Sequence, residues 1–199
     1  MKKLFCIAVL LGLCAFGGMA EAVPGDVADA PAAVNVPATE APVAVAGVDA
    51  PYDGVWQPFE DGFKLYLPRD WSAADLTEAQ REAGLFYRAS NGDGAMGIAV
   101  GYMRAVGLTT VADLARDFRR AGFEGVARAD LNGIPAIGFE RARDNYRGVA
   151  FFHPVYPDYA LYVYFTPLNA QDADSTRTGD ALLSSIGPLG GSAERLKNN

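Results

Sequence analysis

The stretch HPVYPDYALYVYF, residues 153–165, contains the chain's only histidine, His153, together with four of its nine tyrosines. A histidine can act as a general base when a carboxylate orients its ring and a reacting group lies within reach. The nearest carboxylate, Asp158, follows beyond Pro157, and the intervening Pro-Val-Tyr-Pro sequence is typical of a loop. We therefore expect a loop followed by a strand, and a hydrolase that uses His153 is the less favoured alternative.

The strand expected over 159–165 has two different faces. Leu161, Val163 and Phe165 alternate with Tyr162 and Tyr164, which predicts an apolar face opposite a tyrosine face. Packing against a helix is the first explanation for the tyrosine face. A partner surface is the second, because tyrosine is enriched in binding surfaces. The candidate surface residues from this stretch are His153, Tyr156, Tyr159, Tyr162 and Tyr164.

Four arginines complete the candidate partner surface, and they are expected on neighbouring strands. An arginine cluster can bind a carboxylate or phosphate through paired hydrogen bonds. Local pairing with Asp130, Glu140 and Asp144 is the favoured alternative, because most surface charges pair locally or are solvated. The four residues are Arg128, Arg141, Arg143 and Arg147.

Other patterns for catalysis or metal binding are weak. The sequence has no G-x-S-x-G motif for a serine nucleophile. Residues 172–180, DADSTRTGD, begin like a calcium loop, but Arg177 stands where a glycine is needed and Leu183 where a glutamate is needed. A helix-capping loop is the better interpretation of this segment. We therefore predict no catalytic residue, no metal ligand and no cofactor.

Several segments predict the elements that would position these residues. Strands are expected over 62–68, 85–90 and 95–104, and a helix over 72–84 with Ser72 as its cap. One face of the strand over 95–104 carries only alanine and glycine, which indicates that a helix packs close to it.

The second half of the chain has the clearest patterns. Thr110 caps a helix that ends at Gly122, with Asp113 at the third helical position. Asn132-Gly133 predicts a type I′ hairpin turn. Two aromatic strands and a closing helix in ALLSSIGPL, residues 181–189, complete the domain. About seven strands with two or three helices, joined mostly by short turns, predict an α+β fold with an antiparallel sheet flanked by helices.

This order of elements resembles the PsbP-like and DcrB-like α/β sandwich domains over about residues 55–189. The segments that carry the resemblance are GFKLYLPRDW, TVADLARDF, LNGIPAIGFE and SSIGPL. The resemblance implies a central antiparallel sheet flanked by helices, and a role as a non-catalytic binding or assembly module. It carries over no functional residue.

The first 22 residues have the features of a secretory signal peptide. Lys2 and Lys3 precede an apolar run over 4–16, and Ala20-Glu21-Ala22 forms an A-x-A cleavage site. The run is too short to span a membrane, which takes about 20 residues. Lipidation of Cys14 is the less favoured alternative, because the preceding residue is the large Leu13. Cleavage after Ala22 removes both cysteines and leaves no transmembrane segment.

The remaining organisation is a tether, a domain and a tail. Residues 23–51 are rich in Ala, Val and Pro and contain no aromatic residue, which predicts a disordered tether. The domain is expected over 52–189, and residues 190–199 form a polar tail. The formal net charge of −7 argues against nucleic-acid binding, because the phosphate backbone repels an acidic chain.

Together these patterns predict an exported protein, periplasmic or extracellular, that acts as a non-enzymatic accessory module. Its expected partner is a protein of the cell envelope. The alternative is a small-ligand carrier with a pocket between the sheet and the helix over 110–121.

Overall fold

The computed structural model describes residues 50–168 and 173–189. The expected signal peptide with Ala20 and Ala22, nearly all of the expected tether, and the 190–199 tail lie outside these residues. None of the helices in the described ranges combines the length and the apolar character needed to cross a membrane.

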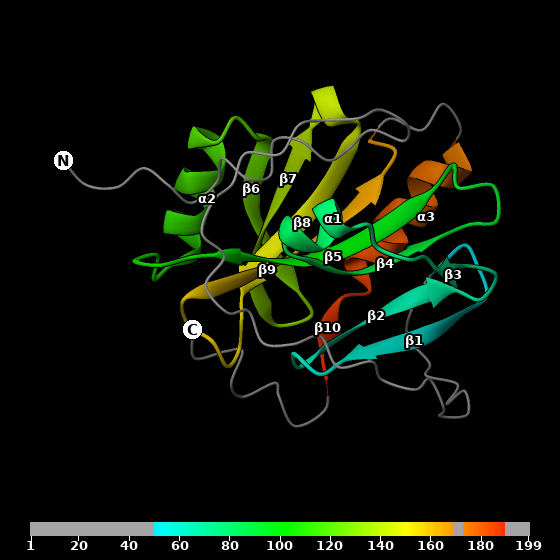
Figure 1. Ribbon diagram of the computed structural model, residues 1–199, viewed down its shortest axis with the longest axis horizontal. Helices are drawn as coiled ribbons and strands as arrows, with labels where there is room; N and C mark the ends of the chain where they lie inside the picture. The colour runs from blue at the N-terminus through cyan, green and yellow to red at the C-terminus, as the bar shows by residue number, and fades with distance from the viewer. Residues whose placement is uncertain (1–49, 169–172, 190–199) are drawn as a thin grey trace.

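Two antiparallel sheets and three helices form the domain, which confirms the α+β sandwich predicted from the sequence (Figure 1). The larger sheet has the strand order β3-β4-β5-β9-β8-β7-β6 and the smaller sheet the order β1-β2-β10. The smaller sheet consists of β1 (Gly54–Phe59), β2 (Phe63–Pro68) and β10 (Gly187–Pro188). The larger sheet consists of β3 (Ser72–Ala73), β4 (Leu85–Ser90), β5 (Gly97–Arg104), β6 (Glu124–Leu131), β7 (Ile134–Arg141), β8 (Tyr146–Phe152) and β9 (Tyr159–Thr166).

The helices lie on both faces of the larger sheet. They are α1 (Glu78–Glu82), α2 (Val111–Arg120) and α3 (Ala173–Ser184), and a short 3-10 helix spans Ala142–Asp144. The smaller sheet and α3 cover one face, and their side chains share a core cluster with that face. Helix α2 covers the other face through contacts with β6, β7 and β8, and α1 contacts β4 (Figure 1).

Strand β9 supplies side chains to both cores, as its alternation predicts. Leu161, Val163 and Phe165 lie in the core under the smaller sheet. Tyr162 lies in the other core and is only 2% exposed. The tyrosine face is therefore covered at this position.

The ring of Tyr162 also explains the small residues of β5. A Cβ built on Gly101 would lie 2.5 Å from the Tyr162 hydroxyl oxygen and 2.8 Å from the Gly84 carbonyl oxygen. The hydroxyl donates to the Ala83 carbonyl at 3.3 Å, at the end of α1. The small face of β5 thus accommodates a tyrosine from the neighbouring strand and the chain just after α1, where the sequence led us to expect a packed helix.

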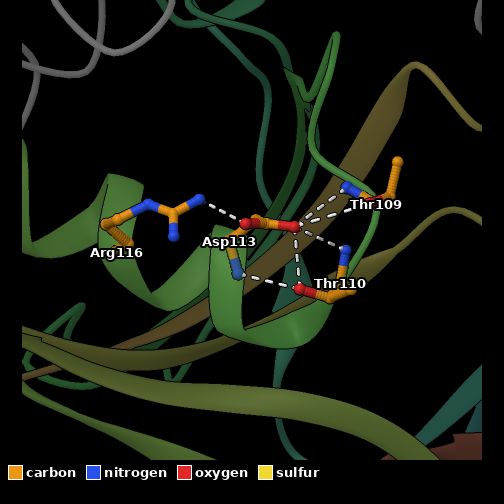
Figure 2. Close-up of polar contacts among 4 residues, drawn as sticks. All are labelled: Thr109, Thr110, Asp113 and Arg116. Atoms are coloured by element: carbon orange, nitrogen blue, oxygen red, sulfur yellow. Dashed lines mark hydrogen bonds and ion pairs between the residues drawn. The ribbon is translucent and has the colours of Figure 1, made fainter.

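Helix α2 begins with the predicted cap (Figure 2). The Thr110 hydroxyl accepts a hydrogen bond from the Asp113 backbone N–H at 3.1 Å, and Asp113 Oδ2 accepts from the Thr110 backbone N–H at 3.1 Å. Arg116 forms an ion pair with the other oxygen of Asp113. These reciprocal bonds satisfy N–H groups that the first helical turn leaves unpaired. Leu114, Ala115 and Phe118 are buried against the sheet.

The hairpin between β6 and β7 confirms the Asn132-Gly133 prediction. Both residues have positive φ angles, 55° and 94°, as the two central positions of a type I′ turn require. Asn132 also donates through its amide to the Ile186 carbonyl at 2.8 Å. The turn therefore ties the larger sheet to the chain that leads into β10.

Two further local predictions were wrong, and one strand was not predicted. Ser72 lies in strand β3, and Thr77 caps α1 instead, with Gln80 completing the capping box. The 173–180 part of DADSTRTGD belongs to α3 and is not a capping loop. Strand β1 had no clear alternation and contains Pro58, so the sequence pattern did not indicate it.

Candidate functional site

A buried hydrogen-bond network joins the two sheets at one end of the sandwich. His153 follows β8 and is 1% exposed, while Asp61 lies in the turn between β1 and β2. The His153 Nε2 atom is 3.0 Å from Asp61 Oδ1, and the Tyr102 hydroxyl donates to the same oxygen at 2.7 Å. The carboxylate that contacts His153 is therefore Asp61, whereas the sequence directed attention to Asp158.

The other nitrogen of the His153 ring binds its own loop. His153 Nδ1 accepts hydrogen bonds from the backbone N–H groups of Val155, at 3.0 Å, and Tyr156, at 3.1 Å. Because Nδ1 accepts, Nε2 carries the ring proton and donates it to Asp61. Neither nitrogen is left to take a proton from a substrate. This arrangement suits a structural crosslink better than a general base.

Tyr102 reinforces the network from β5. Burial raises the pKa of its hydroxyl, and the hydrogen bond to the Asp61 carboxylate raises this pKa further, because ionised Tyr102 would face a negative charge. The hydroxyl therefore stays protonated and donates. Aromatic rings enclose the imidazole, with the Tyr156 centroid 4.7 Å and the Tyr102 centroid 5.8 Å from that of His153.

Next to this network, two loops expose apolar side chains. Among the described residues, the exposed large hydrophobic side chains are Val106, Val155 and Tyr156, which are 53%, 52% and 46% exposed. The two loops that carry them are neighbours, since the Ala105 N–H donates to the Asp158 carbonyl at 2.7 Å. The register of β5 with β9 ends just before them, at Arg104 and Tyr159. We call these three residues the apolar tip.

Three exposed charged residues lie on the elements next to the apolar tip, and two of them are acidic. Asp158 is exposed on the same loop as Val155. Glu60 is exposed in the turn that carries Asp61, and it is near enough to Tyr102 to raise the pKa of that hydroxyl. Arg104 is the one exposed base at the end of β5. The local field therefore favours a positively charged group.

The tyrosines predicted for a common surface are not on one surface. Tyr156 is exposed in the loop, and Tyr159 is half-buried at the start of β9. Tyr162 is buried and Tyr164 is half-buried on the α2 side of the sheet, where its ring lies 4.7 Å from that of Tyr146. Of the predicted stretch, Tyr156 has the exposure that a partner contact requires, whereas His153 and Tyr162 are buried.

The four predicted arginines do not form a cluster either. Arg141 is 3% exposed and donates to Asp144 and to the Ala121 carbonyl, each at 2.9 Å. Arg143 shares the Asp144 carboxylate at 3.2 Å. The predicted local pairing with Asp144 thus accounts for both.

The other two arginines lie elsewhere. Arg147 pairs with Asp180 of α3 at 2.5 Å and donates to the Thr176 carbonyl at 2.9 Å. This places Arg147 on the α3 side of the sheet, whereas Arg141 lies on the α2 side. Arg128 is exposed on the edge strand β6. No shared anion site results from these positions.

The part of the chain that the structure describes contains no candidate metal site. No group of three or more His, Cys, Asp and Glu side chains there is arranged to hold a metal ion.

Comparisons with known proteins identify no family. No family model matches the chain, and no curated protein matches it. One similar solved structure is a 1.50 Å crystal structure of a protein from Bacteroides thetaiotaomicron VPI-5482, with 12% sequence identity and a TM-score of 0.39. The match covers 65% of this chain and 46% of that chain, so this chain spans less than half of the other's length. The resemblance to PsbP-like domains stays a prediction.

Proposed function

We propose that this protein is an exported, non-catalytic accessory module that binds another protein of the cell envelope through its apolar tip. The observation that carries the proposal is the exposure of Val106, Val155 and Tyr156 on two adjoining loops. Exposed apolar side chains that gather on adjoining loops are a feature of interaction sites. Tyrosine is also among the residues that contribute most to binding at protein interfaces.

The loop that carries Val155 and Tyr156 is fixed before binding. The backbone N–H groups of Val155 and Tyr156 donate to His153 Nδ1. The backbone N–H of His153 donates to the Tyr159 carbonyl at 3.0 Å. A loop that is already ordered loses less conformational entropy when a partner binds. The histidine network thus supports a binding role by holding the contact residues in place.

The charges around the tip favour a particular kind of partner segment. Glu60 and Asp158 would attract a lysine or arginine, and the exposed ring of Tyr156 offers a face for a cation–π contact. Val106 and Val155 would contact an apolar side chain beside that base. We therefore expect a segment in which an apolar residue adjoins a basic residue.

Two alternatives have less support in the geometry. A ligand carrier would need space between α2 and the sheet, but Phe118 lies there with its ring centroid 4.8 Å from Phe123 and 4.9 Å from Phe139. A hydrolase would need a free nitrogen on His153, and both nitrogens are hydrogen-bonded.

Export is supported by the sequence of residues 1–22, and sequencing of the mature N-terminus tests it, with Val23 as the expected first residue.

Site-specific photo-crosslinking in cells tests the binding surface. A photoreactive residue is placed at position 106 or 156 of the full chain, and a matched control carries it at Arg128, which is exposed on β6. We expect one envelope protein to be captured from the tip positions and not from position 128. The captured peptide should contain a basic residue beside an apolar one. Equal capture from position 128, or an acidic captured peptide, would contradict the proposal.

Binding of the purified partner then gives the energetic test. Tyr156→Ala should weaken the affinity by about tenfold or more, as truncation of an interface tyrosine typically does. Arg128→Ala should leave the affinity unchanged.

A further inference from the structure

Two hydrogen bonds to the buried His153 ring hold the exposed loop, so the conformation of the loop depends on the charge of that ring. We infer that protonation of His153 releases residues 154–157 from the ring and alters the apolar tip, so that acid regulates binding there. As regulation of binding this inference rests on the proposed function, whereas the loop movement itself can be measured without a partner.

The chemistry follows from the two nitrogens. Neutral His153 accepts two backbone N–H bonds at Nδ1 and donates from Nε2. Imidazolium carries a proton on both nitrogens and has no acceptor left. The N–H groups of Val155 and Tyr156 would then point at an N–H group, and they must turn toward water to find an acceptor.

Asp61 makes this an opening of the loop and not a loss of the whole network. Its Oδ1 atom lies 3.0 Å from Nε2, so the positive ring would be held more strongly by the carboxylate. Two backbone hydrogen bonds anchor the loop on both sides. The backbone N–H of His153 donates to the Tyr159 carbonyl, and the backbone N–H of Ala105 donates to the Asp158 carbonyl. Within the segment between these anchors, the Tyr159 N–H also donates to the Tyr156 carbonyl at 3.0 Å. The N–H groups of Val155 and Tyr156 are held by His153 Nδ1, so these are the bonds that protonation would release.

The groups that face the ring come from every neighbouring element. Asp61 and Glu60 lie in the β1–β2 turn, and Tyr102 projects from β5. Tyr156 and Asp158 belong to the same loop as His153, and Tyr159 begins β9, with its ring 6.5 Å from that of Tyr102. Arg104, at the end of β5, is the nearby base.

Amide NMR and hydrogen exchange of the full chain test the release directly. Between about pH 8 and about pH 5, where histidines ordinarily change charge, we expect the Val155 and Tyr156 amides to shift together with the His153 ring nitrogens. Their protection from exchange should fall by about tenfold or more, after correction for the intrinsic effect of pH. Amides elsewhere in β8 and β9 should keep their protection.

Two variants distinguish release of the loop by protonated His153 from general effects of acid. His153→Gln cannot titrate, so the amides of Val155 and Tyr156 should show no transition over the same range. Tyr102→Phe keeps both bonds to Nδ1 but removes a donor from Asp61. The carboxylate then attracts the imidazolium more strongly, so we expect the same transition at higher pH.

The outcomes are distinct. The inference is overturned if His153 stays neutral down to about pH 5, if it titrates while both amides keep their protection, or if His153→Gln shows the same transition. Photo-crosslinking from position 106 at the two pH values then tests the link to binding. Capture that differs between the two pH values in the wild type, and not in His153→Gln, supports regulation. No capture at either pH refutes the binding function, and equal capture refutes its regulation.

Discussion

His153 Nε2 and Asp61 Oδ1 lie 3.0 Å apart, although 92 residues separate them in the sequence. The bond connects the turn of the smaller sheet to a loop of the larger sheet, so it joins the two layers of the sandwich at one end. Asp61 Oδ1 also accepts a hydrogen bond from the Tyr102 hydroxyl, so one carboxylate oxygen binds a buried donor, His153, and a half-buried one, Tyr102. Two predictions about the contribution of Asp61 to stability follow from this relationship.

Asp61→Ala should destabilise the domain by about 1–3 kcal/mol, because it leaves the buried Nε2–H of the His153 ring and the half-buried Tyr102 O–H without their acceptor. The free energy of unfolding measured in denaturant checks this. Asp158→Ala is the matched control, since that carboxylate is exposed on the adjacent loop and should change stability by less than about 0.5 kcal/mol.

The partners of Asp61 also make a prediction about pairs of mutations. Tyr102→Phe removes one of the two donors, so the cost of Asp61→Ala should be smaller in that background than in the wild type. Strictly additive costs would show that the hydroxyl and the carboxylate do not stabilise one another.

Gly101→Ala should cost about 1–3 kcal/mol, as overpacking in a filled core does. The added Cβ would lie 2.5 Å from the Tyr162 hydroxyl oxygen and 2.8 Å from the Gly84 carbonyl oxygen. Gly138→Ala is the control on another strand of the same sheet, because its Cβ would meet only the Gly148 carbonyl oxygen, at 4.0 Å. Thermal unfolding of both variants measures the two losses of stability. Equal losses would contradict this account of the small face of β5.

The sequence predicted the elements whose signals are local. The Thr110–Asp113 cap and the Asn132-Gly133 turn depend on residues within a few positions of each other, and both were confirmed. The alternation in β9 likewise identified which side chains enter each core.

The site could not be predicted in the same way. Asp61 lies in a turn with no motif, and its contact with His153 exists only because the smaller sheet packs on the larger one. Arg141 and Arg147 are close in sequence, but alternation along the antiparallel strands sends them to opposite faces. The exposure of Val106 and Val155 follows from the meeting of two loops, which no periodicity indicates.

Leu114→Ala should destabilise the domain by about 2–4 kcal/mol, because it leaves a cavity in the core between α2 and the sheet. Arg120→Ala, on the exposed side of the same helix, should change the free energy of unfolding by less than about 0.5 kcal/mol. A small effect of Leu114→Ala in denaturant titration would show that the α2 interface is loosely packed.

The cap of α2 should make stability depend on acid. Hydrogen bonding from Thr110 lowers the pKa of Asp113 in the folded state, with a further contribution from the Arg116 ion pair. Because the folded pKa is below the unfolded value of about 3.9, the contribution of ionised Asp113 is fully present above that value and is lost as pH falls through the folded pKa. Thr110→Ala should therefore destabilise the protein by about 1 kcal/mol near neutral pH. The difference between Thr110→Ala and the wild type should shrink as pH falls below about 4. Denaturant unfolding of both proteins across this range measures it, and a difference that stays constant down to the lowest pH would show that the Thr110–Asp113 bond does not depend on the charge of the carboxylate.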